Sequence, residues 1–260
     1  MGSKWLEKLQ ASCEGLKADA LFILVDQTGS NMSLVSSLNT FQPPLEWCFL
    51  FEGLPEEAME EDAPLLIQLS LSRPLERLWL AGLLAAPVWQ ERILLLCSRW
   101  PFVKLAACLK QCVDAQWEGR GGILRFYDPR LFPLLMSTVL DERQRAYLLA
   151  PALFWSWQDR DGKLRMLPGE EKAPDGDESL KIDLSDAQIE KLLCVGDTNL
   201  FILHNGGTES YRLSEEQLFM RCYNAMLEAN ERGLIIDAQR DAHVAATLTP
   251  WRKVDDGVTQ

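Results

Sequence analysis

The sequence predicts an α/β fold in which a mixed or largely parallel sheet is flanked by helices, followed by a smaller, mainly helical C-terminal lobe. Two observations lead to this prediction. Short apolar runs alternate with helical patterns between residues 20 and 128. Helical patterns then predominate after a charged stretch at 168–181 that is rich in proline and glycine. We therefore divide the chain into an α/β domain at 1–167, an acidic linker at 168–181 and a helical lobe at 182–260.

Continuous apolar runs in the first domain indicate strands that are buried on both faces. The first four expected strands are 20–25, 47–51, 65–69 and 93–97. We expect the central strand at 123–127, between a glycine pair and Asp128, with Asp128 as the N-cap and Pro129 as the first residue of the next helix. Two further apolar segments, 151–158 and 163–167, predict a hairpin.

Apolar residues at helical spacing predict helices around these strands. The pattern at 74–89 places Leu75, Leu78, Trp79 and Leu83 on the inward face, and the pattern at 129–150 is broken near Asp141. In the C-terminal lobe, Ser185 and Ser214 each open a helix with a Ser-x-x-Gln capping box. The expected helices span 4–17, 31–38, 74–89, 101–113, 129–150, 185–195, 214–230 and 237–248.

Charge and cysteine content restrict the class of protein. The net charge is −12, of which residues 1–165 carry −3 and residues 166–260 carry −9. This acidity argues against nucleic acid or an anionic membrane surface as the main partner, because both attract cations. Seven cysteines without framework spacing indicate reduced thiols. Charges at Lys4, Glu7 and Lys8 argue against a signal peptide, so we expect a cytoplasmic protein.

Sequence signatures of enzymes are mostly absent. The chain has no nucleophile elbow, no phosphate-binding glycine loop, no dinucleotide fingerprint and no zinc-protease motif. It has only two histidines, and Cys108 and Cys112 on one helix face lack a second pair that could complete a zinc site. We therefore expect no cofactor, no metal and no catalytic residue.

Charged residues follow three of the predicted strands: Asp26, Glu52, and Arg125 with Asp128. In a parallel sheet they would gather at one edge, where a carboxylate cluster could serve a hydrolase. The alternative, which we favour, is an ion-paired scaffold. An arginine within an apolar run needs a carboxylate or carbonyl partner, and the carboxylate of Glu52 or Asp26 is the expected one.

Two apolar surfaces are candidates for binding a partner protein, although core packing is the commoner role of such residues. Trp155 and Trp157 share one face of a strand, and they would form a binding patch if that strand lay at a sheet edge. The helix at 214–230 presents an apolar stripe of similar ambiguity. Its candidate residues are Leu218, Phe219, Cys222, Tyr223 and Met226.

Four segments in this order, 21–26, 49–56, 63–69 and 124–130, resemble the domain of unknown function found in type VI secretion effector adaptors, also called effector chaperones. The Arg-Phe-Tyr-Asp-Pro element is the most specific part and the Glu-Gly-x-Pro turn the second. The resemblance covers roughly residues 20–160. By the pattern of this family the signature positions are Asp26, Glu52, Gly53, Pro55, Arg125, Tyr127, Asp128 and Pro129.

This resemblance implies a non-catalytic adaptor that acts in the bacterial cytoplasm. Its partners would be a toxin effector and the valine-glycine-repeat (VgrG) spike protein onto which the effector is loaded. We expect the acidic helical lobe to contact the effector, because variable cargo calls for a variable surface. Two other hypotheses stay open: a hydrolase that uses Asp26, Glu52 and Asp128, and an immunity protein that neutralises a toxin.

Overall fold

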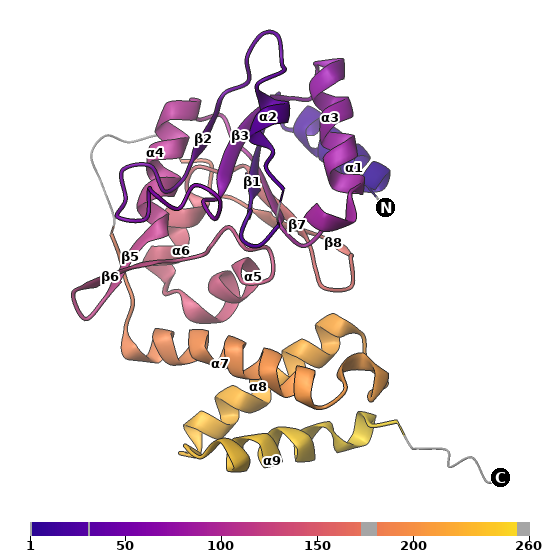
Figure 1. Cartoon of the computed structure of the whole chain (residues 1–260), viewed down its shortest axis with the longest axis vertical. Coiled ribbons are helices and arrows are strands. Elements are labelled where there is room, and N and C mark those ends of the chain that lie inside the picture. The colour runs from indigo at the N-terminus through magenta and orange to yellow at the C-terminus, as the bar shows by residue number, and fades with distance from the viewer. Residues whose placement is uncertain (1, 31, 173–180, 254–260) are drawn as a thin grey trace, which may run out of the picture. The chain divides into compact units, whose positions relative to one another are not determined.

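The computed structural model describes residues 2–30, 32–172 and 181–253. The chain forms two compact units, Met1–Leu184 and Ser185–Gln260. Unit 1 is built on β-sheets with helices, and unit 2 is helical (Figure 1). The predicted linker began at residue 168, but Pro168 is part of a strand, and the Gly169 and Lys172 N–H groups donate to the Leu153 and Ala150 carbonyls at 2.9 Å. Residues 173–180 of that linker lie outside the described residues.

The main sheet of unit 1 has six strands in the order β2-β3-β1-β4-β7-β8, and every neighbouring pair is antiparallel. The predicted mixed or largely parallel sheet is therefore wrong. Both β3 and β4 pair with β1 on opposite sides, so they run in the same direction without touching. Helix α3 makes the crossover between them. The strands are β1 (Ala20–Val25), β2 (Trp47–Phe49), β3 (Leu65–Ser70), β4 (Ile93–Cys97), β7 (Phe154–Gln158) and β8 (Leu164–Pro168).

Helices cover both faces of this sheet, which explains the continuous apolar runs (Figure 1). One face packs on α1 (Gly2–Gly15) and α3 (Pro74–Ala85), and includes Leu21, Ile23 and Val25 of β1. The other face meets α4 (Phe102–Val113), where the Phe22 and Phe102 rings stack with centroids 6.5 Å apart. The other helical elements of this unit are short. They are α2 (Val35–Leu38), η1 (Pro87–Trp89), α5 (Phe132–Leu134), the π-helical turn η2 (Leu135–Val139) and α6 (Glu142–Leu149).

Two of the four residues predicted on the inward face of α3, Leu83 and Trp79, do pack on the core, but the other two do not. Leu75 and Leu78 are each 69% exposed, whereas Glu76 is buried. The Glu76 carboxylate accepts the Ser70 N–H at 2.7 Å through Oε2 and the Arg73 guanidinium at 2.9 Å through Oε1. Helical spacing alone did not reveal that Glu76 would accept a backbone N–H at the end of β3, which turns the face of α3 with Glu76 toward the sheet.

The predicted central strand at 123–127 is also wrong. A second, three-stranded sheet has the order β6-β5-β9, from β5 (Asp114–Trp117), β6 (Arg120–Ile123) and β9 (Ile182–Asp183). The chain leaves it at Ile123, and residues 124–128 follow an irregular path. Asp128 does not cap a helix; its Oδ1 accepts the Arg130 N–H at 2.9 Å in a tight turn, and α5 begins later. Asp141 forms a capping box with Gln144, so the break predicted there is confirmed.

Unit 2 consists of α7 (Asp186–His204), α8 (Glu215–Glu231) and α9 (Asp237–Leu248), with the short turns η3 (Gly207–Glu209) and η4 (Thr249–Trp251). The capping boxes predicted at Ser185 and Ser214 are confirmed. The Phe219 and Tyr223 rings stack with centroids 6.0 Å apart, and the Tyr223 hydroxyl donates to the Lys191 carbonyl at 3.2 Å. Among the described residues, no helix of either unit is long and apolar enough to span a bilayer.

Candidate functional site at the end of strand β1

Asp26 directly follows β1 and is the most deeply buried acid of the signature residues. Its side chain is 3% exposed and its Oδ2 accepts the Arg125 Nη2 at 2.5 Å. The second oxygen, Oδ1, accepts the Thr28 N–H at 3.1 Å, while the Asp26 N–H donates to the Arg92 carbonyl at 2.9 Å. The expected partnership of Arg125 with Asp26 or Glu52 is thus resolved in favour of Asp26. These bonds hold the end of β1 against the irregular segment at 124–128.

Asp128 and Arg130 form a second ion pair beside the first. Asp128 accepts Arg130 through two parallel bonds, Nε to Oδ1 at 3.1 Å and Nη2 to Oδ2 at 3.0 Å. The Arg125 Nη2 lies 4.0 Å from the Asp128 Oδ2, so Arg125 bridges the two carboxylates. Burial disfavours the Arg125 charge, but attraction to Asp26 outweighs it and raises the pKa of the guanidinium. Hydrogen bonds to Asp128 raise the pKa of Arg130 in the same way.

Tyr127 lies within this charged cluster and is almost fully buried. Burial, and after it the negative charge of Asp26, raises the pKa of the Tyr127 phenol above its usual range. Its neighbour Phe126 packs edge-on against Trp155 with the ring centroids 6.4 Å apart. The segment therefore combines an aromatic anchor in the core with a charged outer edge. The Arg125 side chain is 41% exposed as a whole, but its Nε atom is buried and has no hydrogen-bond partner among the described residues.

Glu52 does not join Asp26 and Asp128. Its carboxylate pairs with the Lys110 ammonium of α4 at 2.7 Å and also accepts the Phe49 N–H at 3.4 Å. Gly53 follows with φ +81°, a left-handed conformation that favours glycine, so Gly53 and Pro55 belong to the turn after β2. The three carboxylates of the hydrolase hypothesis are therefore not gathered at one place, and each is paired with a cation of this chain. In each pair the cation neutralises the carboxylate, and the carboxylate also binds a backbone N–H of the adjacent turn.

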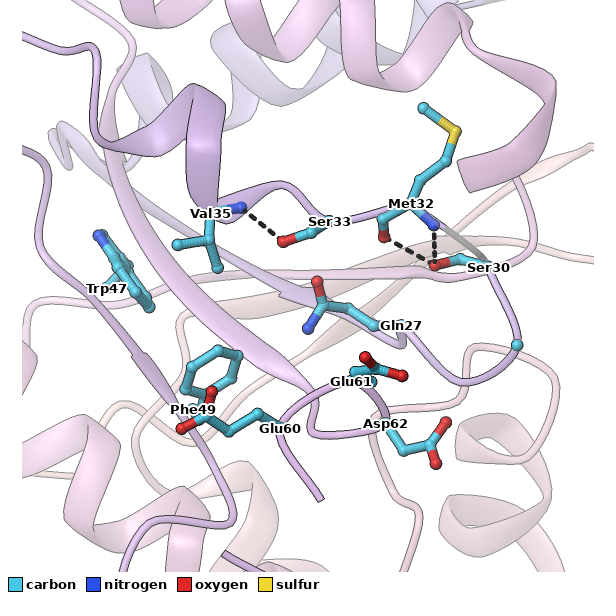
Figure 2. A pocket seen from close by; sticks show the side chains of 11 residues that line it. Gln27, Ser30, Met32, Ser33, Val35, Trp47, Phe49, Glu60, Glu61 and Asp62 are labelled. Carbon is cyan, nitrogen blue, oxygen red and sulfur yellow. Dashed lines mark hydrogen bonds between the residues drawn. The ribbon is translucent and has the colours of Figure 1, made fainter. Parts of the chain in front are cut away.

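A pocket of about 810 Å³ begins at the residue after Asp26 (Figure 2). Gln27 is 3% exposed, and its Nε2 donates to the Ala63 carbonyl at 2.9 Å. Figure 2 shows this side chain directed into the pocket, with Glu61 on one side and Ser33 and Val35 on the other. The remaining lining comes from the loop after β1, from strand β2 and from the turn before β3: Gly29, Ser30, Met32, Trp47, Phe49, Glu60 and Asp62.

Sequence reasoning did not find this pocket. Two signals were available: the acidic run at 56–62, and the aromatic residues at 47 and 49, which a strand places on one face. Neither signal indicates by itself that Gln27, Gly29, Ser30, Met32 and Ser33 line the same pocket. The bond from Gln27 to Ala63 joins these two parts of the pocket wall.

The candidate partner-binding residues are all buried. Trp155 and Trp157 lie on β7, which has neighbours on both sides, so the edge position that a binding patch required is not present. Both indoles pack against the Phe132 ring, with centroid distances of 4.9 and 5.4 Å. On α8 the apolar stripe faces inward; its buried members are Leu218, Phe219, Cys222, Tyr223 and Met226.

The cysteine pair on α4 belongs to unit 1 and His243 to unit 2. Cys108 and Cys112 are buried on α4, and His243 Nε2 lies 3.3 Å from the Glu228 carboxylate in unit 2. Over the described ranges, no group of three or more histidine, cysteine or acidic side chains could hold a metal ion.

The family model of a domain of unknown function, DUF4123, matches residues 21–147, a little under half of the 260 residues. The match begins in β1 and ends in α6, and it includes all eight signature residues as well as the lining of the pocket. No curated protein and no solved structure matches the chain. Unit 2 lies outside the matched segment.

Proposed function

We propose that the chain is a non-catalytic adaptor that binds a toxin effector in the bacterial cytoplasm and loads it onto the VgrG spike of a type VI secretion system. The observation that carries the proposal is the DUF4123 match over residues 21–147. A domain of this family indicates a role related to type VI secretion. Adaptor activity is the finer proposal, which we add from the signature residues and from the structure.

The geometry of the signature residues supports a binding protein over a hydrolase. A hydrolytic pair of carboxylates needs one group that can hold or accept a proton beside the reacting atoms. Here the Asp26 and Asp128 carboxylates bind the Arg125 and Arg130 guanidinium groups, and Glu52 pairs with Lys110 elsewhere. This arrangement serves to hold a scaffold together, and a scaffold of two units offers surface for two partners.

Co-purification tests the proposal directly. The full-length chain is mixed with the effector and with the spike protein that are encoded beside its gene, first separately and then together. An adaptor is expected to retain each protein alone and to form a three-protein complex with both. Failure to retain either protein would contradict the adaptor function.

A cellular experiment separates an adaptor from an immunity protein. Deleting the gene is expected to abolish delivery of the effector to neighbouring cells, while the producing cell stays healthy. An immunity protein gives the opposite result, because its loss exposes the producing cell to its own toxin. Arg125→Lys, which keeps the cation at the Asp26 pair, is a suitable complementation control for a scaffold role.

A further inference from the structure

We propose that the pocket beside strand β2 binds a lysine- or arginine-bearing segment of a partner protein. This inference adds a ligand chemistry to the proposed function. It rests on that function in one respect, namely that the partner is a protein. It assigns a ligand chemistry to one surface of unit 1, a surface distinct from the paired charges at Asp26 and Arg125. Charge, an oriented acceptor, aromatic rings and an available sheet edge each contribute to the argument.

The charges of the pocket lining are all negative. Glu60, Glu61 and Asp62 lie on its wall, and no lysine, arginine or histidine lines it. Over the described part of the chain, no basic side chain forms an ion pair with these three carboxylates. Like charges that converge on a concave surface focus the field and raise the local concentration of cations. A positively charged ligand is therefore the complement of this surface.

Gln27 supplies a second and independent observation. The side chain is 3% exposed, and its amide nitrogen is fixed by the Ala63 carbonyl at 2.9 Å. This bond orients the amide and leaves Oε1, a hydrogen-bond acceptor, without a partner among the described residues. Oε1 is not one of the fully buried atoms that lack a partner, so it is accessible from the pocket and can accept a hydrogen bond from a donor of the ligand. Ammonium and guanidinium groups donate hydrogen bonds and accept none.

Two aromatic rings prepare the pocket for the apolar stem of a basic side chain. Trp47 and Phe49 pack edge to face with centroids 5.6 Å apart, and both line the pocket. Lysine and arginine place their methylene stems along apolar surface while the charge stays near polar groups. An indole face also attracts a cation, and more strongly so when water is excluded. The two aromatic rings thus match the methylene stem of a lysine or arginine, and the acidic residues match its charged end.

The size and position of the pocket favour a polypeptide over a small cation. A volume of about 810 Å³ lies within the range of pockets that take whole drug-sized ligands. Strand β2 is also at the edge of the sheet. The Gln68 N–H donates to the Glu46 carbonyl, and the Leu50 N–H donates to the Pro64 carbonyl. The backbone N–H and C=O groups of residues 46, 48 and 50 therefore face β3, whereas those of Trp47 point away from the sheet. An extended segment can pair with this edge.

Charge reversal in the full-length protein tests the proposal. The probes are a capped lysine-rich peptide, the same peptide with every lysine changed to glutamate, and a peptide array that tiles the effector and the spike protein. Glu60→Lys/Glu61→Lys is expected to weaken binding of the lysine-rich peptide by at least about tenfold at low ionic strength. Glu60→Gln/Glu61→Gln should give an intermediate loss. The glutamate peptide should not bind the wild-type protein.

Glu56→Lys/Glu57→Lys is the matched control, because it makes the same change of charge in the same connection between β2 and β3 without altering the pocket lining. We expect it to change affinity by less than about threefold, since Glu57 is exposed, Glu56 is partly exposed, and charges away from the pocket are screened by salt. Equal losses in both double variants would mean general attraction to an acidic surface and would overturn the pocket. Equal competition by arginine amide and by the peptide would mean a small-cation site and would overturn the polypeptide.

Failure of this inference can be distinguished from failure of the proposed function. If the effector or the spike protein still binds Glu60→Lys/Glu61→Lys with unchanged affinity and the array selects neutral segments, the pocket inference is wrong and the adaptor function stands. If neither protein binds the wild-type chain, yet lysine-rich peptides bind it and lose affinity in this variant, the adaptor function is wrong and the pocket chemistry stands.

Discussion

Two groups of carboxylates near the end of β1 differ in how their charges are balanced. Asp26 is buried, and its charge is met by Arg125 at 2.5 Å and by the Thr28 N–H at 3.1 Å. Glu60 and Glu61, which line the pocket that starts at Gln27, are exposed and form no ion pair with the described residues. The first group completes its interactions within the chain. The second has charge to offer a partner.

This difference separates residues that maintain the fold from residues that are available for binding. The charged signature residues Asp26, Arg125 and Asp128 belong to the first kind, because they form one set of ion pairs, which Arg130 extends through Asp128. The pocket belongs to the second kind and contains none of those four residues. Changes in the two groups should therefore affect different measurements, stability in one and binding in the other.

Arg125→Ala is expected to have the largest effect on stability. The substitution leaves the Asp26 carboxylate buried with only a backbone N–H, so we expect unit 1 to lose about 2–4 kcal/mol of unfolding free energy. The partial exposure of Arg125 favours the lower part of this range. Urea unfolding followed by tryptophan fluorescence measures it, because eight of the nine tryptophans lie in unit 1. Arg125→Lys should recover part of the loss. A fully stable Arg125→Ala protein that had lost one partner would instead make this cluster a binding site.

Tyr127→Phe should alter the pH dependence of the same cluster. The raised pKa of Tyr127 means that its stabilising contribution is complete below the ordinary pKa of 10.0 and is lost as pH rises through the folded-state value. The variant lacks this titration. At pH 11 it should therefore gain about 1 kcal/mol relative to wild type, compared with their difference at pH 7. Tyr223→Phe in unit 2, where burial raises the pKa to about 12, is the control. An equal effect of both variants on the transition of unit 1 would argue against a local cause.

Lys110→Met tests whether the Glu52 ion pair maintains the fold as the Asp26 pair does. The Lys110 and Glu52 side chains are 24% and 46% exposed, so solvent screens their attraction. We expect a loss below about 0.5 kcal/mol in the same urea experiment. A loss as large as that of Arg125→Ala would show that the Glu52 and Asp26 ion pairs contribute equally to stability.

Glu60→Lys/Glu61→Lys should have the smallest effect on stability. No ion pair with the described residues is broken, and reversing two charges relieves repulsion within an acidic turn. We expect the unfolding free energy to stay constant or to rise by up to about 0.5 kcal/mol. Differential scanning calorimetry on this variant and on Glu56→Lys/Glu57→Lys measures the change. A marked loss of stability would assign these carboxylates to the fold and would remove the contrast with Asp26.

Local patterns identified many elements in advance. The strands predicted at 20–25 and 93–97 have those bounds in the structure, and the capping boxes at Ser185 and Ser214 form as expected. Each of these features depends on residues that are close in the chain, such as an uninterrupted apolar run or a serine three residues before a glutamine. The requirement that Arg125 have a carboxylate partner was equally readable, because an unpaired buried charge is too costly.

Other features depend on residues that are distant in the chain, and only the tertiary structure decided them. Alternation of strand and helix indicated a crossover, but the insertion of β1 between β3 and β4 made the sheet antiparallel. Helical spacing could not show that Glu76 would be buried in place of Leu75. The sequence by itself determined which residues had to be covered or paired. Folding decided which partner met Arg125, and it left Glu60 and Glu61 without an ion pair in the described part of the chain, since pairing depends on distances that the backbone sets.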